Sequence, residues 1–436
     1  MSGPVTLAAG GQDWARLRLW LADRLEASLA GKVKLERTPS SLQLLQERFQ
    51  LACQHAKIAV PPPQQEQLFN EVVDEVIGLG PIEALLRDDK VSEVMVNGPR
   101  LVYVERQGKL VEQNVAFVDD AHLQKVINKI VAPLGRHVDA ESPMVDARLP
   151  DGSRVNAVVP PCAIDGPSVT IRKFAKTQLG IPDLIRFGSL SEDMASYLEA
   201  CIVSKLNVVV SGGTGSGKTT LLNVLSGFIP EGERIITIED AAELKLNQRH
   251  VVRLETKRPT RAGESQVTIR DLVINSLRMR PERIIVGECR GGEALDMLQA
   301  MNTGHDGSLT TLHANTPRDA ISRLETLVLM AGMDLPIQVV RKQIASAVHL
   351  IVQQARLRDG SRKVTQITEV VGMEGDTMVM QDIFRFEDKG EENGKVLGEH
   401  AACGMRPAYE ERLKLHGFNL PGKMFLKANT PNAWRK

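Results

Sequence analysis

The chain has 436 residues, of which 42% are hydrophobic, and this length predicts two to four domains with a substantial core. Its 54 Lys and Arg residues balance 54 Asp and Glu residues, so we expect no direct nucleic-acid binding. Five widely separated cysteines exclude a zinc module or a disulfide framework and fit a reducing cytosol. Because there is no run of about 18 apolar residues, we expect a chain that is neither exported nor membrane-spanning.

Residues 1–80 have the periodicity of helices. Helices are predicted over 13–30, 42–58 and 64–77, with the prolines at 61–63 stopping the second of them. Arginines interleave with the apolar residues of the first helix. This pattern fits either a packed helix with a solvated face or a basic helix that lies on a membrane or a partner. The apolar residues of that helix include Trp14, Leu17, Trp20, Leu21 and Leu25.

From residue 91 the pattern changes to alternating apolar and polar residues separated by turn signals, which predicts a small sheet. A helix is predicted over 122–131, and two further strand segments follow, the first folded at a turn at 151–152. Arg148 and Arg154 lie on either side of that turn, where they are ordinary solvated charges unless a partner engages them. This region is therefore predicted to be an α+β module that ends near Phe174.

The segment NVVVSGGTGSGKTT, residues 207–220, predicts a nucleotide site. Gly212, Gly217, Lys218 and Thr219 have the spacing of a phosphate-binding P-loop, with a predicted strand at 208–210 and a helix opening at 219 or 220. Its backbone N–H groups hold phosphates, the lysine adds charge and the threonine hydroxyl reaches Mg²⁺. A chance glycine-rich turn would lack the flanking strand and helix. The residues expected to bind ATP are Gly212, Gly213, Thr214, Gly215, Ser216, Gly217, Lys218, Thr219 and Thr220.

After residue 181, short apolar strands alternate with helices, which predicts a parallel sheet covered on both faces. Glu239 and Asp240 follow the second strand, Glu288 the third and His313 the fourth, with His305 just before it. Ligands bind beyond the carboxyl ends of such strands, so we expect these residues to lie near the P-loop. Taken singly, each also fits a helix cap or a turn. The strands are predicted at 207–211, 235–238, 283–286 and 309–312.

Three ordered segments make the pattern more specific. They are GGTGSGKTT, TIEDAAEL and LRMRPERIIVGECRGGEALDMLQAMNTGHDGSLTTLHANTPRDAISRLE. In this order they resemble the secretion ATPase superfamily of type II secretion, type IV pilus and type IV secretion motors, roughly over 91–354. QDIFRFE and GMRPAYEERLKLHGFNLP near the C-terminus, together with DARLPDGSRVNAVVPP, most resemble the tight-adherence (Flp) pilus assembly ATPases.

The resemblance implies roles for individual residues. Glu239 is similar to the carboxylate that orients or deprotonates the attacking water, and Glu288 to the Walker B acid that holds Mg²⁺ through water. His305 and His313 match the histidine box, in which His313 would sense the γ-phosphate. Gly287 stands where most P-loop ATPases have a Mg²⁺-binding Asp, which leaves the division of labour between the two glutamates open.

The resemblance also implies an assembly. Arg148 and Arg154 look like arginine fingers that an N-terminal domain gives to a neighbouring subunit of a homo-hexamer. Members of the family contact an inner-membrane platform protein, so we expect a cytoplasmic chain that is peripheral at that membrane. The expected fold is α/β, with a RecA-like P-loop domain built on a mostly parallel sheet. Its predicted parts are a helical region 1–80, an α+β (PAS-like) domain 81–175, a linker or hinge 176–185, the RecA-like domain 186–386 and a tail 387–436.

The predicted function is an ATPase that uses ATP and Mg²⁺ to drive assembly of an Flp (type IVb) pilus. A type IV secretion traffic ATPase or a pilus retraction motor is the alternative, although the long tail and the absence of Cys-x-x-Cys disfavour retraction. A RecA-like nucleic-acid motor and a low-turnover nucleotide switch are more distant alternatives. The basic stretch 249–261 is interpreted as a solvated loop, or as a surface that faces a pore or a partner.

Overall fold

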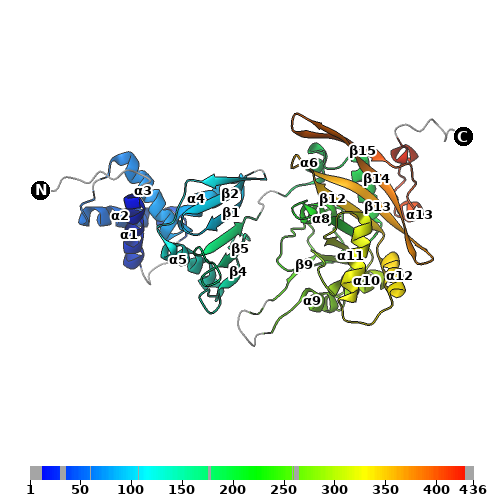
Figure 1. The fold of residues 1–436 in the computed structure, drawn as a ribbon, viewed down its shortest axis with the longest axis horizontal. Coiled ribbons are helices and arrows are strands. Elements are labelled where there is room, and N and C mark those ends of the chain that lie inside the picture. Colours follow the sequence, from blue (N-terminus) through cyan, green and yellow to red (C-terminus); the bar gives the residue numbers. More distant parts are fainter. Residues whose placement is uncertain are drawn as a thin grey trace. The chain divides into compact units, whose positions relative to one another are not determined.

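The computed structural model describes residues 12–29, 36–58, 60–106, 108–174, 178–257, 259 and 265–427. The chain divides into two compact units, Met1–Lys176 and Thr177–Lys436 (Figure 1). Both units combine helices with a sheet, so the fold is of the mixed α/β kind. Among the described residues, no helix combines the length and the apolar character that a membrane span requires.

Three helices open the first unit and enclose a small core of their own. Trp14 is buried in it, and its indole N–H donates to Glu71 Oε2 at 2.9 Å. The interpretation of the first helix as a packed helix is therefore confirmed for its apolar face, while Trp20 remains exposed. The helices are α1 (Gln12–Leu29), α2 (Pro39–His55) and α3 (Pro62–Val76).

The prolines at 61–63 act differently from the prediction. α2 ends at His55, and Pro62 is the first residue of α3. A proline suits this position because its missing N–H would have no partner in the first turn and its fixed φ is already helical. α2 likewise begins at Pro39, after Thr38 accepts a hydrogen bond from the Ser41 N–H as its N-cap.

A six-stranded antiparallel sheet completes the first unit, in the order β3-β2-β1-β6-β5-β4. α5 covers it with buried apolar residues at helical spacing, among them Leu123, Ile127 and Ile130. The elements are η1 (Gly80–Ile82), α4 (Glu83–Arg87), β1 (Val91–Asn97), β2 (Leu101–Arg106), β3 (Lys109–Gln113), α5 (Asp120–Val131), η2 (Ala132–Leu134), β4 (Met144–Arg148), β5 (Arg154–Val158) and β6 (Ser168–Arg172).

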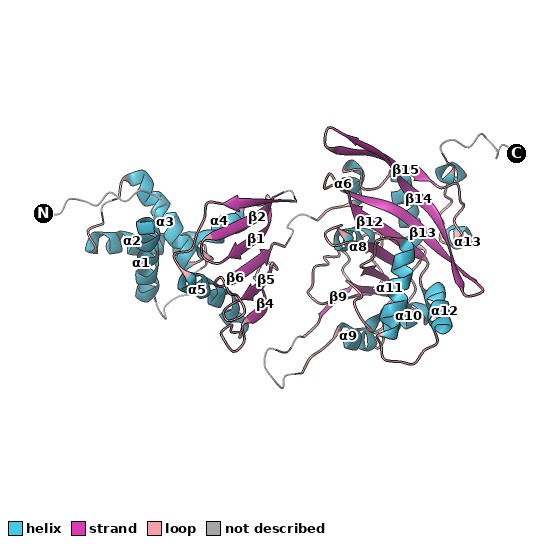
Figure 2. Ribbon diagram, viewed as in Figure 1, coloured by secondary structure: helices cyan, strands magenta, loops and turns pink. Residues whose placement is uncertain are grey.

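The second unit is built on a nine-stranded sheet in the order β15-β14-β13-β12-β7-β11-β10-β8-β9. Figure 2 shows its long strands β13 and β14. Its elements are α6 (Ile181–Arg186), α7 (Glu192–Val203), β7 (Val208–Gly212), α8 (Lys218–Ser226), β8 (Ile235–Glu239), β9 (Val251–Glu255), α9 (Ile269–Ser276), β10 (Arg283–Val286), α10 (Glu293–Asn302), β11 (Leu309–Leu312), α11 (Pro317–Leu329), α12 (Ile337–Ala347), β12 (Leu350–Arg356), β13 (Arg362–Glu374), β14 (Thr377–Glu392), β15 (Lys395–Ala402), α13 (Glu410–Leu415) and η3 (Gly422–Phe425).

The strands from β12 to β9 in this order are all parallel, whereas β13, β14 and β15 extend the sheet by antiparallel pairing. Both faces of β7 are buried. Val208 and Val210 belong to the core that α7 and α8 cover, and Val209 belongs to the core under α9 to α12. Burial on both faces explains why the parallel strands are continuous apolar runs.

Several boundaries differ from the sequence predictions. β7 extends to Gly212, and α8 begins at Lys218, one residue before the predicted start. The interpretation of 249–261 as a solvated loop is wrong for its described part, because β9 pairs with β8 as an edge strand. Arg258 and Arg261 of that stretch lie outside the described residues. The predicted boundary at 386 falls inside β14, and the predicted linker 176–185 includes the start of α6.

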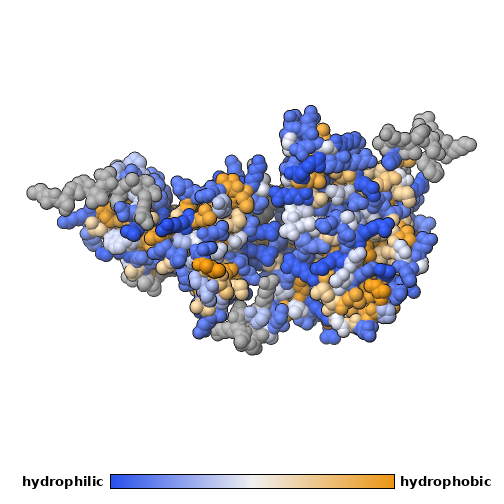
Figure 3. Space-filling view, viewed as in Figure 1, coloured by the Kyte–Doolittle hydropathy of each residue, from blue (hydrophilic) through white to orange (hydrophobic). Residues whose placement is uncertain are grey.

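Most of the face drawn in Figure 3 is hydrophilic, with a hydrophobic area in the region of α10 to α12. The exposed apolar residues of α11, α12 and their connection are Leu329, Met330, Met333 and Val339. Exposed apolar side chains therefore gather in this part of the second unit.

Candidate active site

The glycine-rich segment forms a tight loop between β7 and α8. Gly215 and Gly217 have φ values of +71° and +95°, a region that residues with a side chain rarely adopt. At Gly212 a Cβ atom would lie 2.2 Å from the backbone oxygen of Gln354, so only glycine fits there. Because α8 begins at Lys218, its free N–H groups and the positive end of its dipole lie at the loop. This arrangement is suited to binding a phosphate chain.

Lys218 is buried beside the loop and turns back over it. Its Nζ donates to the Gly213 carbonyl at 3.0 Å and lies 3.2 Å from His313 Nε2. Burial lowers the pKa of Lys218, and Glu288 nearby opposes that effect. Through these two contacts the Lys218 ammonium group is paired with protein atoms and not with phosphate oxygens. An arriving polyphosphate can therefore take over these contacts.

Glu288 follows β10, and its side chain contacts His313, which follows the neighbouring strand β11. Its Oε1 lies 3.1 Å from His313 Nε2, and its Oε2 accepts from Arg290 Nη2 at 2.6 Å. Burial, followed by the charge of Lys218, lowers the pKa of His313, which favours the neutral imidazole. A neutral Nε2 either accepts from Lys218 or donates to Glu288. The tautomer of His313 thus decides which of the two side chains it holds.

Glu239 ends β8, the strand next to β10, and is only 4% exposed. Its Oε1 accepts from the N–H groups of Glu243 at 2.9 Å and Leu244 at 3.1 Å. Burial raises the pKa of Glu239 to about 7 despite these hydrogen bonds. A carboxylate with such a pKa is poised to accept a proton near neutral pH.

The side chain of Glu239 leaves no room for a side chain at position 287. A Cβ atom on Gly287 would lie 2.8 Å from Glu239 Cγ. The space in which an Asp at 287 would place its side chain is therefore filled by the glutamate of the neighbouring strand. This packing accounts for glycine at a position where the P-loop pattern has an acid.

The structure links three of the predicted site residues directly, Lys218, His313 and Glu288. Glu239 lies at the same sheet edge, but none of the hydrogen bonds or ion pairs among the described residues joins it to these three. The expectation that His305 lies with them is wrong. His305 precedes β11, at the opposite edge of the sheet, where its carbonyl accepts from Ser308 Oγ. The whole of β11, about 13 Å of strand, lies between His305 and His313.

Arg148 and Arg154 lie in the first unit, as the last residue of β4 and the first of β5. They are register partners, and Arg172 of β6 is in turn opposite Arg154. Three arginines therefore form one row across the end of the sheet. Arg172 could not be recognised from the sequence as a site residue, because only the strand register brings it beside the other two.

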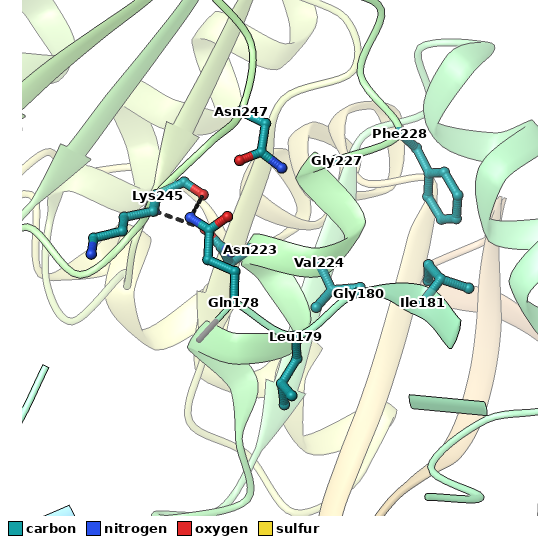
Figure 4. A pocket seen from close by; sticks show the side chains of 10 residues that line it. All are labelled: Gln178, Leu179, Gly180, Ile181, Asn223, Val224, Gly227, Phe228, Lys245 and Asn247. Atoms are coloured by element: carbon teal, nitrogen blue, oxygen red, sulfur yellow. Dashed lines mark hydrogen bonds between the residues drawn. The ribbon is translucent and has the colours of Figure 1, made fainter. Parts of the chain in front are cut away.

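A cavity of about 300 Å³ lies further along α8 (Figure 4). Asn223 and Val224, which line it, are one turn beyond Thr219 and Thr220 on the same face of the helix. Gln178 Nε2 closes one side by donating to the Lys245 carbonyl at 2.9 Å. The cavity is lined by Gln178, Leu179, Gly180, Ile181, Asn223, Val224, Gly227, Phe228, Lys245 and Asn247, so it adjoins the predicted linker and not the phosphate loop.

The metal expectation concerns Thr219, in the first turn of α8, and Glu288. Within the described part of the chain, no group of three or more His, Cys, Asp or Glu side chains could enclose a metal ion. One hydroxyl and one carboxylate suit Mg²⁺, which keeps several waters and is usually shared with substrate phosphates. The residues present are therefore compatible with a nucleotide-bound Mg²⁺.

Comparisons with known proteins agree on one family. The family model described as "Type II/IV secretion system protein" matches residues 75–412. A putative conjugal transfer protein of Mycobacterium tuberculosis is 35% identical over 307 residues, covering 69% of this chain and 87% of its own length. The type IV secretion system protein VirB11 of Bartonella quintana is 32% identical over 341 residues, covering 69% and 94%.

Two further similarities are narrower. An uncharacterized protein of Methanocaldococcus jannaschii is 49% identical over 245 residues, which cover 54% of this chain but only 34% of that protein's length. Among solved structures, the ATPase DotB of Yersinia pseudotuberculosis matches 71% of this chain and 80% of its own, with a TM-score of 0.50 at 17% identity. At that identity the likeness concerns the fold alone.

Proposed function

Since the chain belongs to the type II/IV secretion system protein family, we propose that it is an ATPase that drives assembly of an Flp (tight-adherence) pilus. The observation that carries the ATPase activity in this proposal is the contact of Lys218 with His313, and of His313 with Glu288, at the edge of the sheet where the P-loop lies. A loop that binds phosphate beside a carboxylate and a neutral imidazole has the groups that hydrolysis of a nucleoside triphosphate requires.

In this proposal each residue has a distinct task. The loop amides and Lys218 would hold the phosphates, and Thr219 and Glu288 would hold Mg²⁺. Bound Mg²⁺ neutralises charge that develops on the phosphates. His313 exchanges its contact with Lys218 for one with the terminal phosphate and so reports its presence to Glu288.

Glu239 is proposed to orient the attacking water and to accept its proton. Its raised pKa, about 7, places this transfer near neutral pH. Oε2 makes only a 3.3 Å contact with the Leu244 N–H and can accept from a water, but Glu239 is 4% exposed, so the residues that follow β8 must first let water in. Turnover should therefore depend on movement of the loop that follows β8.

We further propose that the second unit is a RecA-like domain and that residues 81–175 form a PAS-like domain, joined by a hinge near 176–185. Arg148 and Arg154 would act as fingers in the site of a neighbouring subunit of a homo-hexamer. Their position at one end of β4 and β5, outside the unit that holds the P-loop, supports this role. Loss of the terminal phosphate would then change how neighbouring subunits pack.

The chain is proposed to act in the cytoplasm against an inner-membrane platform protein, without direct nucleic-acid binding. The pilus assignment rests on the C-terminal segments, part of which form β14 and α13. A type IV secretion traffic ATPase is the second candidate, because the relatives include VirB11 and a conjugal transfer protein. Neighbouring genes for a prepilin support the first candidate, and a conjugation cluster supports the second.

Steady-state turnover of the purified chain tests the central proposal. We expect Mg²⁺-dependent ATP hydrolysis that is lost in Lys218→Ala, while circular dichroism and thermal unfolding stay unchanged. Undiminished hydrolysis by Lys218→Ala, or none by the wild-type chain, would contradict an ATPase with this site. Strong stimulation by DNA at physiological salt would favour a nucleic-acid motor instead.

Subunit mixing tests the arginine fingers. Arg154→Ala subunits retain an intact P-loop, and Lys218→Ala subunits retain intact arginines. If the fingers act between subunits, mixtures of the two inactive variants should recover part of the activity. Recovery at no mixing ratio would show that the arginines do not act between subunits.

A further inference from the structure

The nucleotide loop packs against a part of the sheet that is remote in sequence. Gly212 leaves no room for a Cβ beside the Gln354 backbone oxygen of β12, and a Cβ on Gly217 would lie 3.1 Å from Arg362 Cδ of β13. Gln354 is itself buried beside the loop, and its Oε1 has no hydrogen-bond partner in the described structure. The outer side of the loop is therefore supported by the end of β12 and the start of β13.

Arg362 makes one hydrogen bond with its side chain, from Nε to the Gly215 carbonyl at 3.0 Å. No hydrogen bond or ion pair joins its terminal nitrogens to any residue in the described ranges. In contrast, Arg358, four positions earlier, forms ion pairs with Asp388 and Glu391 of β14. Arg362 is thus committed to the loop, and not to a salt bridge that would hold strands together.

The bond to Gly215 orients the peptide group between Gly215 and Ser216, within the loop proposed to hold the phosphates. The Gly215 carbonyl and the Ser216 N–H belong to one planar trans peptide unit, so they point in opposite directions. With the carbonyl held outward by Arg362, the Ser216 N–H points across the loop, where it reaches the Gly213 carbonyl at 3.3 Å. That contact is long, and a phosphate oxygen can replace it.

The same short piece of β13 also holds the segment that follows α6. Ser189 Oγ donates to the Arg362 carbonyl at 2.7 Å, and the Val364 N–H donates to the Ser189 carbonyl at 2.8 Å. Lys363 Nζ donates to the Gly188 carbonyl at 2.7 Å. Three residues of β13 therefore hold the start of the second unit, and one of them, Arg362, also contacts the nucleotide loop.

We propose that Arg362 is a positioning residue of the nucleotide loop. It holds the Gly215–Ser216 peptide in the orientation that presents the Ser216 N–H to a phosphate, and it ties that peptide to the segment after α6. This inference rests on the proposed function, because it assigns the loop to a nucleoside triphosphate. Arg362 acts through the backbone amide, so it should affect nucleotide binding more than the chemical step.

The test compares Arg362→Ala and Arg362→Lys with the matched control Arg358→Ala, using both steady-state turnover and binding of a fluorescent ADP analogue. Loss of a charge-assisted hydrogen bond should raise KM for ATP, and Kd for the analogue, about tenfold in Arg362→Ala. kcat should change by less than about twofold, because the interaction is made equally in the ground and transition states. Arg362→Lys keeps a donor without the planar geometry and should give an intermediate KM. Arg358→Ala should bind nucleotide like the wild type.

Three results would overturn the inference. These are an unchanged KM and Kd in Arg362→Ala, an equal rise in Arg358→Ala, and a loss of activity that follows a lower unfolding temperature. If the wild-type chain binds the analogue but hydrolyses no ATP, the proposed function fails. The binding comparison between Arg362→Ala and Arg358→Ala then still decides the role of Arg362.

Discussion

The two edges of the parallel strands both carry charged side chains, and they use them in opposite ways. At the edge where the strands begin, which we call the saturated edge, Arg283 is 0% exposed and every nitrogen of its guanidinium donates a hydrogen bond. It donates twice to Glu233, at 2.6 and 3.1 Å, and to the carbonyls of Ile202 and Gly307. Asn207 is equally satisfied, accepting from the N–H groups at 307 and 308 and donating to the Ala347 carbonyl.

At the edge where the strands end, the same kinds of group are only partly satisfied. The side chains of His313 and Arg290 are 42% and 59% exposed, and His313 Nε2 is shared between Lys218 and Glu288. Where every polar group already has a partner, a disturbance breaks hydrogen bonds and destabilises the fold. Where one side chain is shared between two partners, a ligand can replace one of them, so we call this second edge the exchangeable edge. The first edge is therefore expected to govern stability, and the second to govern activity.

The largest effect is expected at the saturated edge. Arg283→Ala removes the buried partner of the Glu233 carboxylate and leaves it only Lys205, at 3.8 Å, so we expect a loss at the lower end of the range for a broken buried pair, about 3 kcal/mol. Urea unfolding should show this loss, while KM for ATP of the folded fraction stays at the wild-type value. A variant as stable as the wild type would show that this edge does not govern stability.

At the exchangeable edge, Glu288→Gln keeps the size of the side chain and removes its charge. We expect kcat for ATP to fall about a hundredfold, which corresponds to about 2.7 kcal/mol, with little change in unfolding free energy. Steady-state turnover and urea unfolding of the same preparation measure both quantities. A large loss of stability with normal kcat would reverse the contrast between the edges.

Glu239 combines features of the two edges. It is buried, like Arg283 at the edge where the strands begin, but it lies at the edge where they end. Its folded-state pKa of about 7 lies above the ordinary value of 4.5. The stability linked to this group is therefore fully present below pH 4.5 and is lost as pH rises through 7. Glu239→Gln should be more stable than the wild type at pH 8, by up to about 3 kcal/mol, but not at pH 5. Thermal unfolding at the two pH values checks this, and equal differences at both would contradict it.

The smallest effect is expected for Arg290→Ala. Arg290 is largely exposed, and surface ion pairs contribute little. Its removal frees one Glu288 oxygen, so KM for ATP should change by no more than about threefold. Initial rates over a range of ATP concentrations measure this, and a change above tenfold would mean that Arg290 itself contacts the nucleotide.

The strands that could be predicted from the sequence are those whose apolar pattern follows from burial alone. β7, β8, β10 and β11 are buried on both faces, so each is an apolar run that could be recognised without its neighbours. β9 was missed because it is a half-buried edge strand that contains Arg253. The second half of β14 is almost wholly exposed and highly charged, and it is a strand because it pairs with β15.

The candidate site was predictable to the extent that topology determines it. Glu239, Glu288 and His313 follow strands, and the rule for parallel sheets places them at one edge. His305 was misplaced because it is close to His313 in sequence, although a whole strand lies between them. Arg362 could not be predicted, because its contact with Gly215 joins residues 147 positions apart. The orientation of Glu239 toward the amides of Glu243 and Leu244 also depends on packing that no local pattern specifies.

β7 is hydrogen-bonded on both sides, to β11 and to β12. Deuterium should therefore enter its amides among the slowest in the chain, whereas the Ser216 amide, held only by a 3.3 Å contact, should exchange quickly. Nucleotide should slow exchange within residues 213–217 and leave 208–211 unaltered. Nucleotide binding is thus expected to change the exchange of the loop but not that of β7. β7 can therefore serve as an internal reference when exchange is compared with and without nucleotide.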